Sequence, residues 1–341
     1  MQKAKEKFIF TPNERGALSL IRRGYCHSRA EISRRLQISR PTASLLIEKL
    51  IHIGAVHEIG LGKAARGKAP VLLAPNAEFQ YSIGLDLGYS HQLVGVLVDG
   101  QDQIVKQETM EFDNTSLDSI REKSLEMFAS LSRNHTICGL GLSLTGIVNA
   151  AEGKVLRSAN PVFASYPIRD LFTQWTNLPI WISNRSRVEA YSESIGGAVN
   201  LQGDFILCSL GESLDAAFFI NNKIILGPNR AAGEIRHIRL DDGRTLAEAL
   251  VPEAILHASE DDLVAICAEG LFQLTQLLDL KTIVLSGRFT EFGPGFLPKL
   301  TQALSREQEC QVSFSHYGKF SAARGSAMTV AETILSKEDV I

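Results

Sequence analysis

The chain has 341 residues, 45% hydrophobic and 21% charged, with a net charge of −3 at pH 7, which is typical of a soluble globular protein of two or three domains. No apolar run is long enough to cross a membrane, the N-terminus lacks a signal peptide's apolar core, and the five cysteines are scattered, so we expect a reducing cytoplasm. Residues 1–75 contain 14 basic and 5 acidic residues. The chain has 35 basic and 38 acidic residues in all, so the remainder contains 21 basic and 33 acidic ones. This asymmetry favours a nucleic-acid-binding head on an acidic body.

Capping signals predict three short helices in the first 75 residues. Thr11 to Glu14 form a capping box with proline at the first helical position, Ser28 to Glu31 form a second box, and Ser39 caps the third helix. Apolar residues in the third helix recur at the spacing of one buried face: Ala43, Leu46, Ile47, Leu50 and Ile51. The short connection at 37–39 predicts a helix-turn-helix.

The polar face of the third helix predicts DNA binding. We expect this face to present Arg40, Thr42, Ser44, Glu48 and Lys49, of which the arginine, threonine and serine can reach base edges and phosphates. Residues 55–73 then predict two strands around a basic loop, a wing whose tip at 66–68 suits a narrow minor groove. The predicted DNA-binding residues are Ser39, Arg40, Thr42, Ser44, Lys49, Lys63, Arg66 and Lys68. A winged helix that binds protein is the alternative.

From residue 81 onwards, strands alternate with helices, and one pattern occurs twice. IGLDLGYS (83–90) is echoed by FILCSLGES (205–213), and each is followed by an apolar strand and a turn, Asp99-Gly100 or Asn221-Asn222. Both turns suit tight hairpins that need positive φ. Two such units predict two similar α/β lobes with a ligand cleft between them.

The chain resembles the ROK family of sugar kinases and sugar-responsive repressors. The resemblance covers nearly the whole sequence, through SRAEISRRLQISRPTASLLIEKLIHIGAV, RGKAPVLL, IGLDLGYS, GLGLSLTGIVNAAEGKVLRSANP, AAGEIRH and KTIVLSG. It implies an α/β protein of the repressor branch, with an N-terminal winged helix-turn-helix and a two-lobed, actin-like (ribonuclease-H-like) body. The expected domains are the winged helix at 1–75, lobe 1 at 76–200 and lobe 2 at 201–341, with the C-terminal helix packing back on lobe 1.

Departures from the family's kinase motifs predict that the body does not transfer phosphate. In the first phosphate turn, Asp86-Leu87-Gly88-Tyr89-Ser90, a bulky tyrosine stands where a small residue is usual. The second turn, glycine-rich in the kinases, carries Glu212 and Asp215, whose charges repel phosphate. Arg185 stands where the family has its catalytic aspartate, and a guanidinium cannot accept a proton. We therefore expect no enzymatic activity and no cofactor; a sugar kinase with a fused DNA-binding domain is the alternative.

The family's zinc site is also missing, because no cysteine follows His237, and we expect no metal. The resemblance implies an effector site made of Thr145, Gly146, Asn160, Asn184, Arg185, Glu234, His237 and Glu248. For His237 on its own, a hydrogen-bonded pocket histidine is the favoured interpretation. Arg185 leaves three alternatives: it selects an anionic sugar derivative, it pairs internally with Glu234 or Glu248 and fills the pocket, or the effector is a neutral sugar.

Together these patterns predict a DNA-binding transcriptional regulator, most simply a repressor of sugar-related genes. Its expected partners are a double-stranded DNA operator, a small sugar or sugar-phosphate effector, and a second copy of the chain in a homodimer or dimer of dimers, with no membrane. A protein-interaction role for head and body is a third hypothesis. DNA binding would be distinguished by its steep dependence on salt.

Overall fold

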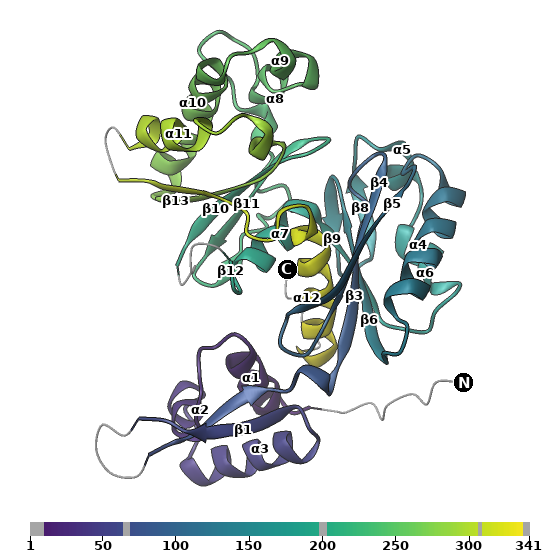
Figure 1. Cartoon of the computed structure of the whole chain (residues 1–341), viewed down its shortest axis with the longest axis vertical. Helices are drawn as coiled ribbons and strands as arrows, with labels where there is room; N and C mark the ends of the chain where they lie inside the picture. Colours follow the sequence, from purple (N-terminus) through teal and green to yellow (C-terminus); the bar gives the residue numbers. More distant parts are fainter. Residues whose placement is uncertain (1–9, 64–68, 198–202, 306–308, 337–341) are drawn as a thin grey trace.

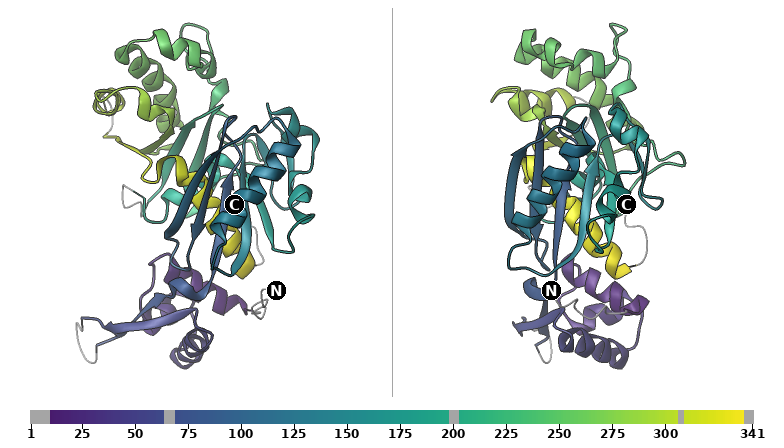
Figure 2. Two further views of the ribbon diagram at one scale, coloured as in Figure 1. Left: turned by 45° about the vertical axis from the view of Figure 1, so that its right-hand side comes forward. Right: turned by 90° about the vertical axis from the view of Figure 1, so that its right-hand side faces the viewer.

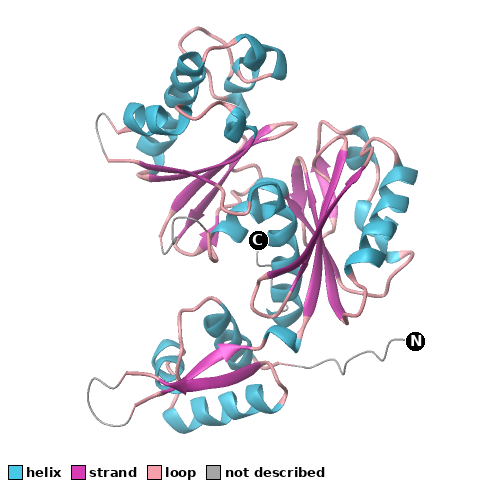
Figure 3. Cartoon of the chain, in the orientation of Figure 1, coloured by secondary structure: helices cyan, strands magenta, loops and turns pink. Residues whose placement is uncertain are grey.

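The computed structural model describes residues 10–63, 69–197, 203–305 and 309–336, so the predicted contacts Arg66 and Lys68 lie outside the described residues. The chain forms three parts: a small N-terminal unit, and two larger units that are each built on a β-sheet (Figure 1). Figure 3 shows helices on the outer faces of both sheets, and further helices between them.

The N-terminal unit is a winged helix-turn-helix. It consists of α1 (Pro12–Arg22), α2 (Arg29–Arg35), α3 (Arg40–His52) and the antiparallel strands β1 (Val56–Leu61) and β2 (Val71–Pro75). The three predicted helices are confirmed, with Thr11, Ser28 and Ser39 as their N-caps. The second capping box is only half formed, because the Glu31 carboxylate accepts from the backbone of His27 instead of Ser28.

The two sheets of the body have the same topology. The first has the order β5-β4-β3-β6-β9, and the second has the order β12-β11-β10-β13-β14. The strands of the first are β3 (Tyr81–Asp86), β4 (Gln92–Val98), β5 (Ile104–Glu111), β6 (Ile137–Leu144) and β9 (Ile180–Asn184). Those of the second are β10 (Phe205–Leu210), β11 (Leu214–Ile220), β12 (Lys223–Ile224), β13 (Thr282–Gly287) and β14 (Gln311–Phe314). In each sheet, the first strand pairs antiparallel with the second, β3 with β4 and β10 with β11, and parallel with a later strand, β6 or β13. This confirms the predicted pair of similar α/β lobes.

Helices cover the outer face of each sheet around a separate hydrophobic core. On the first sheet they are α4 (Leu117–Leu131), α5 (Pro161–Ser165) and α6 (Ile168–Thr173), with the hairpin β7 (Ile147–Asn149) and β8 (Lys154–Arg157) beside them. On the second they are α8 (Leu246–Ala249), α9 (Pro252–His257), α10 (Glu260–Leu278) and α11 (Phe296–Leu304). Four 3₁₀ turns complete the described elements: η1 (Ala77–Phe79), η2 (Ile235–His237), η3 (Arg288–Glu291) and η4 (Gly318–Phe320).

The two predicted hairpin turns differ from one another. Asn221 and Asn222 both have positive φ, 52° and 61°, as a tight turn between β11 and β12 requires. For Asp99-Gly100 the prediction is wrong: the left-handed residue is Asp102, with φ 62°, in a longer loop. Gly100 serves a close approach instead, since a Cβ on it would lie 2.2 Å from the carbonyl oxygen of Asn76. This loop is therefore pressed against the segment that leaves the winged helix.

Two helices, α7 (Arg185–Glu193) and α12 (Ser321–Ser336), pack between the sheets. They form a third core with the valines of β4 and the phenylalanines of β10 and β11. The C-terminal helix α12 lies directly on the first sheet, because glycines there leave no side chain in between. A Cβ on Gly84 would fall 1.8 Å from the carbonyl oxygen of Ala323, and one on Gly141 would fall 2.0 Å from that of Ser326.

The winged helix docks on the body through the end of α1. Figure 2 shows the end of α12 beside it, and the two helices are in contact. Arg22, whose side chain is buried, forms ion pairs with Asp102 at 2.5 Å and with Glu332 of α12 at 3.5 Å. Among the described residues, an exposed hydrogen bond from the Tyr25 hydroxyl to Asn222 reaches the second sheet. The DNA-binding unit is thus held mainly by lobe 1 and α12.

Candidate functional site

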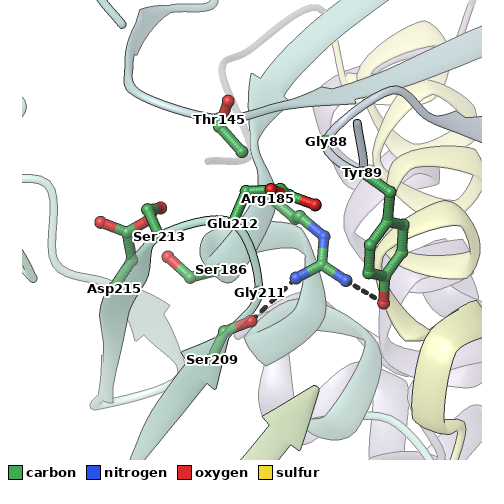
Figure 4. A pocket seen from close by; sticks show the side chains of 10 residues that line it. All are labelled: Gly88, Tyr89, Thr145, Arg185, Ser186, Ser209, Gly211, Glu212, Ser213 and Asp215. Atoms are coloured by element: carbon green, nitrogen blue, oxygen red, sulfur yellow. Dashed lines mark hydrogen bonds between the residues drawn. The ribbon is translucent and has the colours of Figure 1, made fainter. Parts of the chain in front are cut away.

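A narrow cleft lies between the two sheets, at the ends of β3 and β10. It is lined by Gly88, Tyr89, Thr145, Arg185, Ser186, Ser209, Gly211, Glu212, Ser213 and Asp215 (Figure 4). Its cavity volume is about 10 Å³, which is room for about one water molecule. A sugar does not fit in this arrangement of the lobes.

Arg185 fills the centre of the cleft, at the start of α7. Its Nε lies 2.9 Å from the carboxylate of Asp86, and its Nη1 lies 3.0 Å from that of Glu189. Nη1 also donates to the Ser209 hydroxyl, and Nη2 donates to the Tyr89 hydroxyl at 2.6 Å (Figure 4). Of the three alternatives for Arg185, internal pairing is formed, but with the buried carboxylates Asp86 and Glu189 in place of Glu234 or Glu248.

The electrostatics of this cluster follow from burial. Burial alone would lower the pKa of Arg185, but the charges of Asp86 and Glu189 raise it well above its usual value, so the guanidinium stays charged. Burial raises the pKa of the Glu189 carboxyl, and Arg185 opposes that shift. Burial also raises the pKa of Tyr89 to about 12. The cluster is a fixed cation between two carboxylates, and the guanidinium itself cannot take a proton from a substrate hydroxyl.

The two turns that resemble phosphate-binding loops approach this guanidinium closely. A Cβ on Gly88 would lie 2.7 Å from Cδ of Arg185, and one on Gly211 would lie 3.3 Å from its Nη1. The Ser90 hydroxyl donates to Glu212 at 2.7 Å, which joins the two turns across the cleft. These residues do not fit a nucleotide phosphate with its metal, because Asp86 is already neutralised and Glu212 adds negative charge.

Four of the predicted effector residues come together at the cleft. Thr145 and Arg185 line it, and Asn184, the N-cap of α7, donates to the Gly146 carbonyl at 2.8 Å. Gly146 has φ 100°, and a Cβ on it would lie 2.2 Å from the carbonyl oxygen of Arg157, so this loop packs tightly against β8.

Glu234 lies near these residues but is occupied by cations. Its carboxylate is 3.3 Å from Arg157 and 2.7 Å from Arg236, and Arg236 also pairs with Asp215 of the cleft. Burial raises the pKa of Asp215, with partial compensation from Ser213 and Arg236. Ion pairs of alternating charge therefore connect Arg157, Glu234 and Arg236 to Asp215 in the lining of the cleft.

The other three predicted effector residues have local roles. Asn160 caps α5 and donates to the carbonyl of Asn114. The carboxylate of Glu248 accepts from the backbone and hydroxyl of Thr245 in the capping box of α8, facing solvent. His237 is exposed, which contradicts our expectation of a hydrogen-bonded histidine inside a pocket.

Several residues of this cluster were not predicted. Glu189 stands four residues after Arg185, the spacing of an ion pair along a helix, so that pairing was available from the sequence. Arg187 is buried and donates to the carbonyl of Arg230; burial, with repulsion from Arg230, lowers its pKa to about 10. Arg236 pairs with the nearby Glu234 and also with Asp215, 21 residues before it, and no local pattern signals the second pairing.

On the winged helix, the predicted DNA-binding residues divide into exposed and internally engaged groups. Arg40 and Lys63 are exposed, and Ser44 is half-buried. The Ser39 hydroxyl accepts from the backbone of Thr42 and shares a 2.7 Å hydrogen bond with its hydroxyl. Lys49 does not belong to the free outward face, since its ammonium lies 2.8 Å from Glu14 of α1. Arg34, exposed at the end of α2, is a basic residue that the prediction missed.

Neither a metal site nor a membrane span emerges from the described residues. Within 10–63, 69–197, 203–305 and 309–336, no three histidine, cysteine, aspartate or glutamate side chains are grouped to bind a metal ion. No helix in these ranges combines the length and apolar character needed to cross a bilayer.

Comparison with known proteins gives a consistent answer. The chain is 31% identical over 225 residues to the xylose repressor of Caldicellulosiruptor bescii, which covers 63% of the chain and 55% of the repressor. It is 24% identical over 246 residues to the xylose repressor of Bacillus spizizenii, covering 71% and 64%. The chain thus spans less than two thirds of the length of these repressors.

Two solved structures share its architecture. A ROK family transcriptional regulator, a homologue of the E. coli MLC protein, superimposes with a TM-score of 0.74 at 17% identity over 95% of this chain and 96% of that one. A ROK family glucokinase from Streptomyces griseus, in complex with glucose and AMPPNP, gives a TM-score of 0.65 at 18% identity over 73% and 98%. The body therefore has the actin-like ROK fold, and the expected fold class is confirmed.

The sequence profile of the ROK family matches residues 82–254, half of the chain, from the first strand of lobe 1 to the helices of lobe 2. The chain belongs to the ROK family.

Proposed function

We propose that this protein is a DNA-binding transcriptional repressor whose kinase-like body senses a sugar or sugar derivative without phosphorylating it. The observation that carries the proposal is the cleft, in which Arg185, at the position where the resemblance implies the family's catalytic aspartate, holds Asp86 in an ion pair. The winged helix attached to this body supplies an exposed arginine at the start of α3, where a major-groove helix makes base contacts. The names of the related xylose repressors support the same conclusion.

The proposed division of labour follows the expected domains, with DNA binding in 1–75 and effector binding between lobes 76–200 and 201–341. A cytoplasmic homodimer, or dimer of dimers, would present two α3 helices to the half-sites of a near-palindromic operator. Effector binding would change the lobe arrangement and, through it, the spacing of the two DNA-binding units.

Effector binding requires the cleft to open, because its present cavity is too small for a sugar. Two exposed polar links cross it, the Ser90–Glu212 hydrogen bond and the Arg157–Glu234 ion pair, and Arg185 adds a buried hydrogen bond to Ser209. Opening would free Glu234 and the loop at Thr145-Gly146, while the buried Arg185 would keep its own carboxylates. The pocket would then favour a neutral ligand with hydroxyl groups over an anionic sugar derivative, because the charge of Arg185 would stay paired.

Arg40→Ala tests the DNA-binding proposal. If the guanidinium makes a bidentate base contact, the variant should lose roughly 1–3 kcal/mol of operator binding free energy in a fluorescence anisotropy titration. Arg244→Ala, on the surface of lobe 2, is the matched control and should bind normally. Unchanged operator affinity of Arg40→Ala would show that this residue does not make the contact. DNA affinity that does not change with salt concentration would contradict the proposal as a whole.

A thermal-shift screen tests the effector and the absence of phosphoryl transfer together. ATP should leave the melting temperature unmoved, whereas one of the neutral sugars, amino sugars, sugar phosphates or sugar acids should raise it. A coupled phosphorylation assay with ATP and a panel of hexoses completes the experiment. Measurable turnover would contradict the proposal and favour the alternative, a sugar kinase with a fused DNA-binding domain.

A further inference from the structure

The DNA-facing helix α3 presents an apolar side chain at the middle of its outward face. Its buried face is formed by Ala43, Leu46, Ile47 and Leu50. On the opposite side, Leu45 is 69% exposed and does not belong to the core of the winged helix. Pro41, one turn earlier, is also exposed, and helical geometry places the two side by side. The Leu45 side chain is therefore free to contact a partner.

The amino end of this strip is basic, whereas Glu48, about one turn after Leu45, is an exposed carboxylate. Arg34 at the end of α2 and Arg40 at the start of α3 are exposed, and neither has an ion-pair partner in the described part of the chain. Lys49, by contrast, is turned toward α1 by Glu14. The face that α3 offers a partner therefore combines free cations at its amino end with an apolar centre.

DNA matches this combination. Its phosphates pair with arginine, and among the base edges of the major groove the 5-methyl group of thymine is the apolar feature. Leucine has no donor or acceptor, so it can distinguish thymine from cytosine only through contact with that methyl group.

We propose that Leu45 contacts the methyl group of a thymine in the major groove and so determines part of the operator sequence. This inference rests on the proposed DNA-binding function and adds a named specificity residue to it. It predicts that each bound half-site contains a thymine whose methyl group, rather than its pairing edge, contributes to affinity.

Uracil substitution tests this contact, because uracil pairs like thymine but lacks the methyl group. The full chain is first used to enrich tight-binding duplexes from a library with a randomised centre. Each thymine of an enriched duplex is then replaced singly by uracil, and binding is measured for wild type, Leu45→Ala and Leu256→Ala. The last is a matched control, since Leu256 is also an exposed leucine, 78% exposed, but lies on α9 of lobe 2.

The expected result is that wild type and Leu256→Ala lose roughly fourfold in affinity at one thymine position, the effect of one buried methyl group. Leu45→Ala should bind the unmodified duplex more weakly by a similar factor and be insensitive to uracil at that position. Insensitivity of wild type to every uracil, or the same uracil effect in Leu45→Ala, would overturn the inference while leaving DNA binding intact. Failure to enrich any duplex would overturn the DNA-binding function itself.

Discussion

A single side chain determines the chemistry of the cleft. Arg185 is 6% exposed and lies against Asp86 and Glu189, both of which are fully buried. Desolvating three charged groups is costly, and the ion pairs offset that cost only while all three are present. The guanidinium also stacks on the ring of Tyr89, with its carbon 4.4 Å from the ring centre. Its contribution is therefore to neutralise and hold the junction between the lobes.

Arg185→Ala should destabilise the protein by about 3–5 kcal/mol in urea unfolding, because it leaves two buried carboxylates without a cation. The defect should shrink as the pH falls: burial raises the pKa of Glu189, and a carboxyl with a raised pKa in the folded state opposes folding less once it is protonated. Arg244→Ala, which removes an exposed pair with Asp242, serves as the control and should leave the midpoint unchanged. An unchanged midpoint for Arg185→Ala would contradict the structural role of this residue.

At the scale of elements, the caps of the winged helix combine local and tertiary contacts. Glu14 completes the capping box of α1 by accepting from the backbone of Thr11, and its other oxygen accepts from Lys49 of α3. Burial raises the pKa of the Glu14 carboxyl, but the hydrogen bonds and charge of Lys49, together with those from Thr11, more than offset this, so the pKa is lowered. One carboxylate thus joins the two helices that orient the DNA-binding surface.

Glu14→Gln should lower the stability of the protein at neutral pH, and the difference from wild type should disappear in acid. A carboxyl with a lowered pKa in the folded state stabilises above its usual value, 4.5, and this contribution is lost as the pH falls through the folded-state pKa. The measurement is urea unfolding of both proteins from neutral pH to below about 4.5. Glu58→Gln is the control, because the Glu58 carboxylate, paired with Arg29, is more exposed than that of Glu14. A difference that persists in acid would point to packing instead of charge.

The sequence was sufficient where the physical cause is local. Thr11, Ser28 and Ser39 each bond to a backbone amide three residues on, so the three helix starts were predictable. The partners of Arg185 were not, because Asp86 is 99 residues away and enters the cleft only when β3 and α7 pack together. Glu248 is the opposite case: its position matches the family pattern, and its contacts in this structure are those of its local capping box with Thr245.

At the scale of the whole molecule, the winged helix is attached unequally to the two lobes. Arg22 is buried between Asp102 and Glu332, and these charges raise its pKa despite the opposing effect of burial. Arg23 adds a hydrogen bond to the Tyr191 hydroxyl of α7. Apart from α12, the part of the chain from 201 onwards that the structure describes contributes the exposed Tyr25–Asn222 hydrogen bond to this attachment. The winged helix is therefore expected to move with lobe 1 when the lobes change their arrangement.

Arg22→Ala should loosen this attachment, because Asp102 loses its buried cation. In scanning calorimetry we expect the winged helix of the variant to unfold at a lower temperature relative to the body than it does in wild type. Hydrogen exchange of α1 should accelerate at the same time. Arg34→Ala removes an exposed arginine of the same unit and should preserve the wild-type profile. A wild-type profile for Arg22→Ala would show that packing alone holds the units together.

The Arg185 cluster also limits how this protein can evolve. Replacing the arginine alone leaves Asp86 and Glu189 uncompensated, and replacing either carboxylate alone weakens the hold on a buried guanidinium. The glycines at 88 and 211 are constrained by the same side chain, because a Cβ on either would crowd it. These positions are epistatic: each substitution is tolerated only in the company of others. A different use of the cleft would require several coordinated substitutions, so selection is expected to preserve these five residues together.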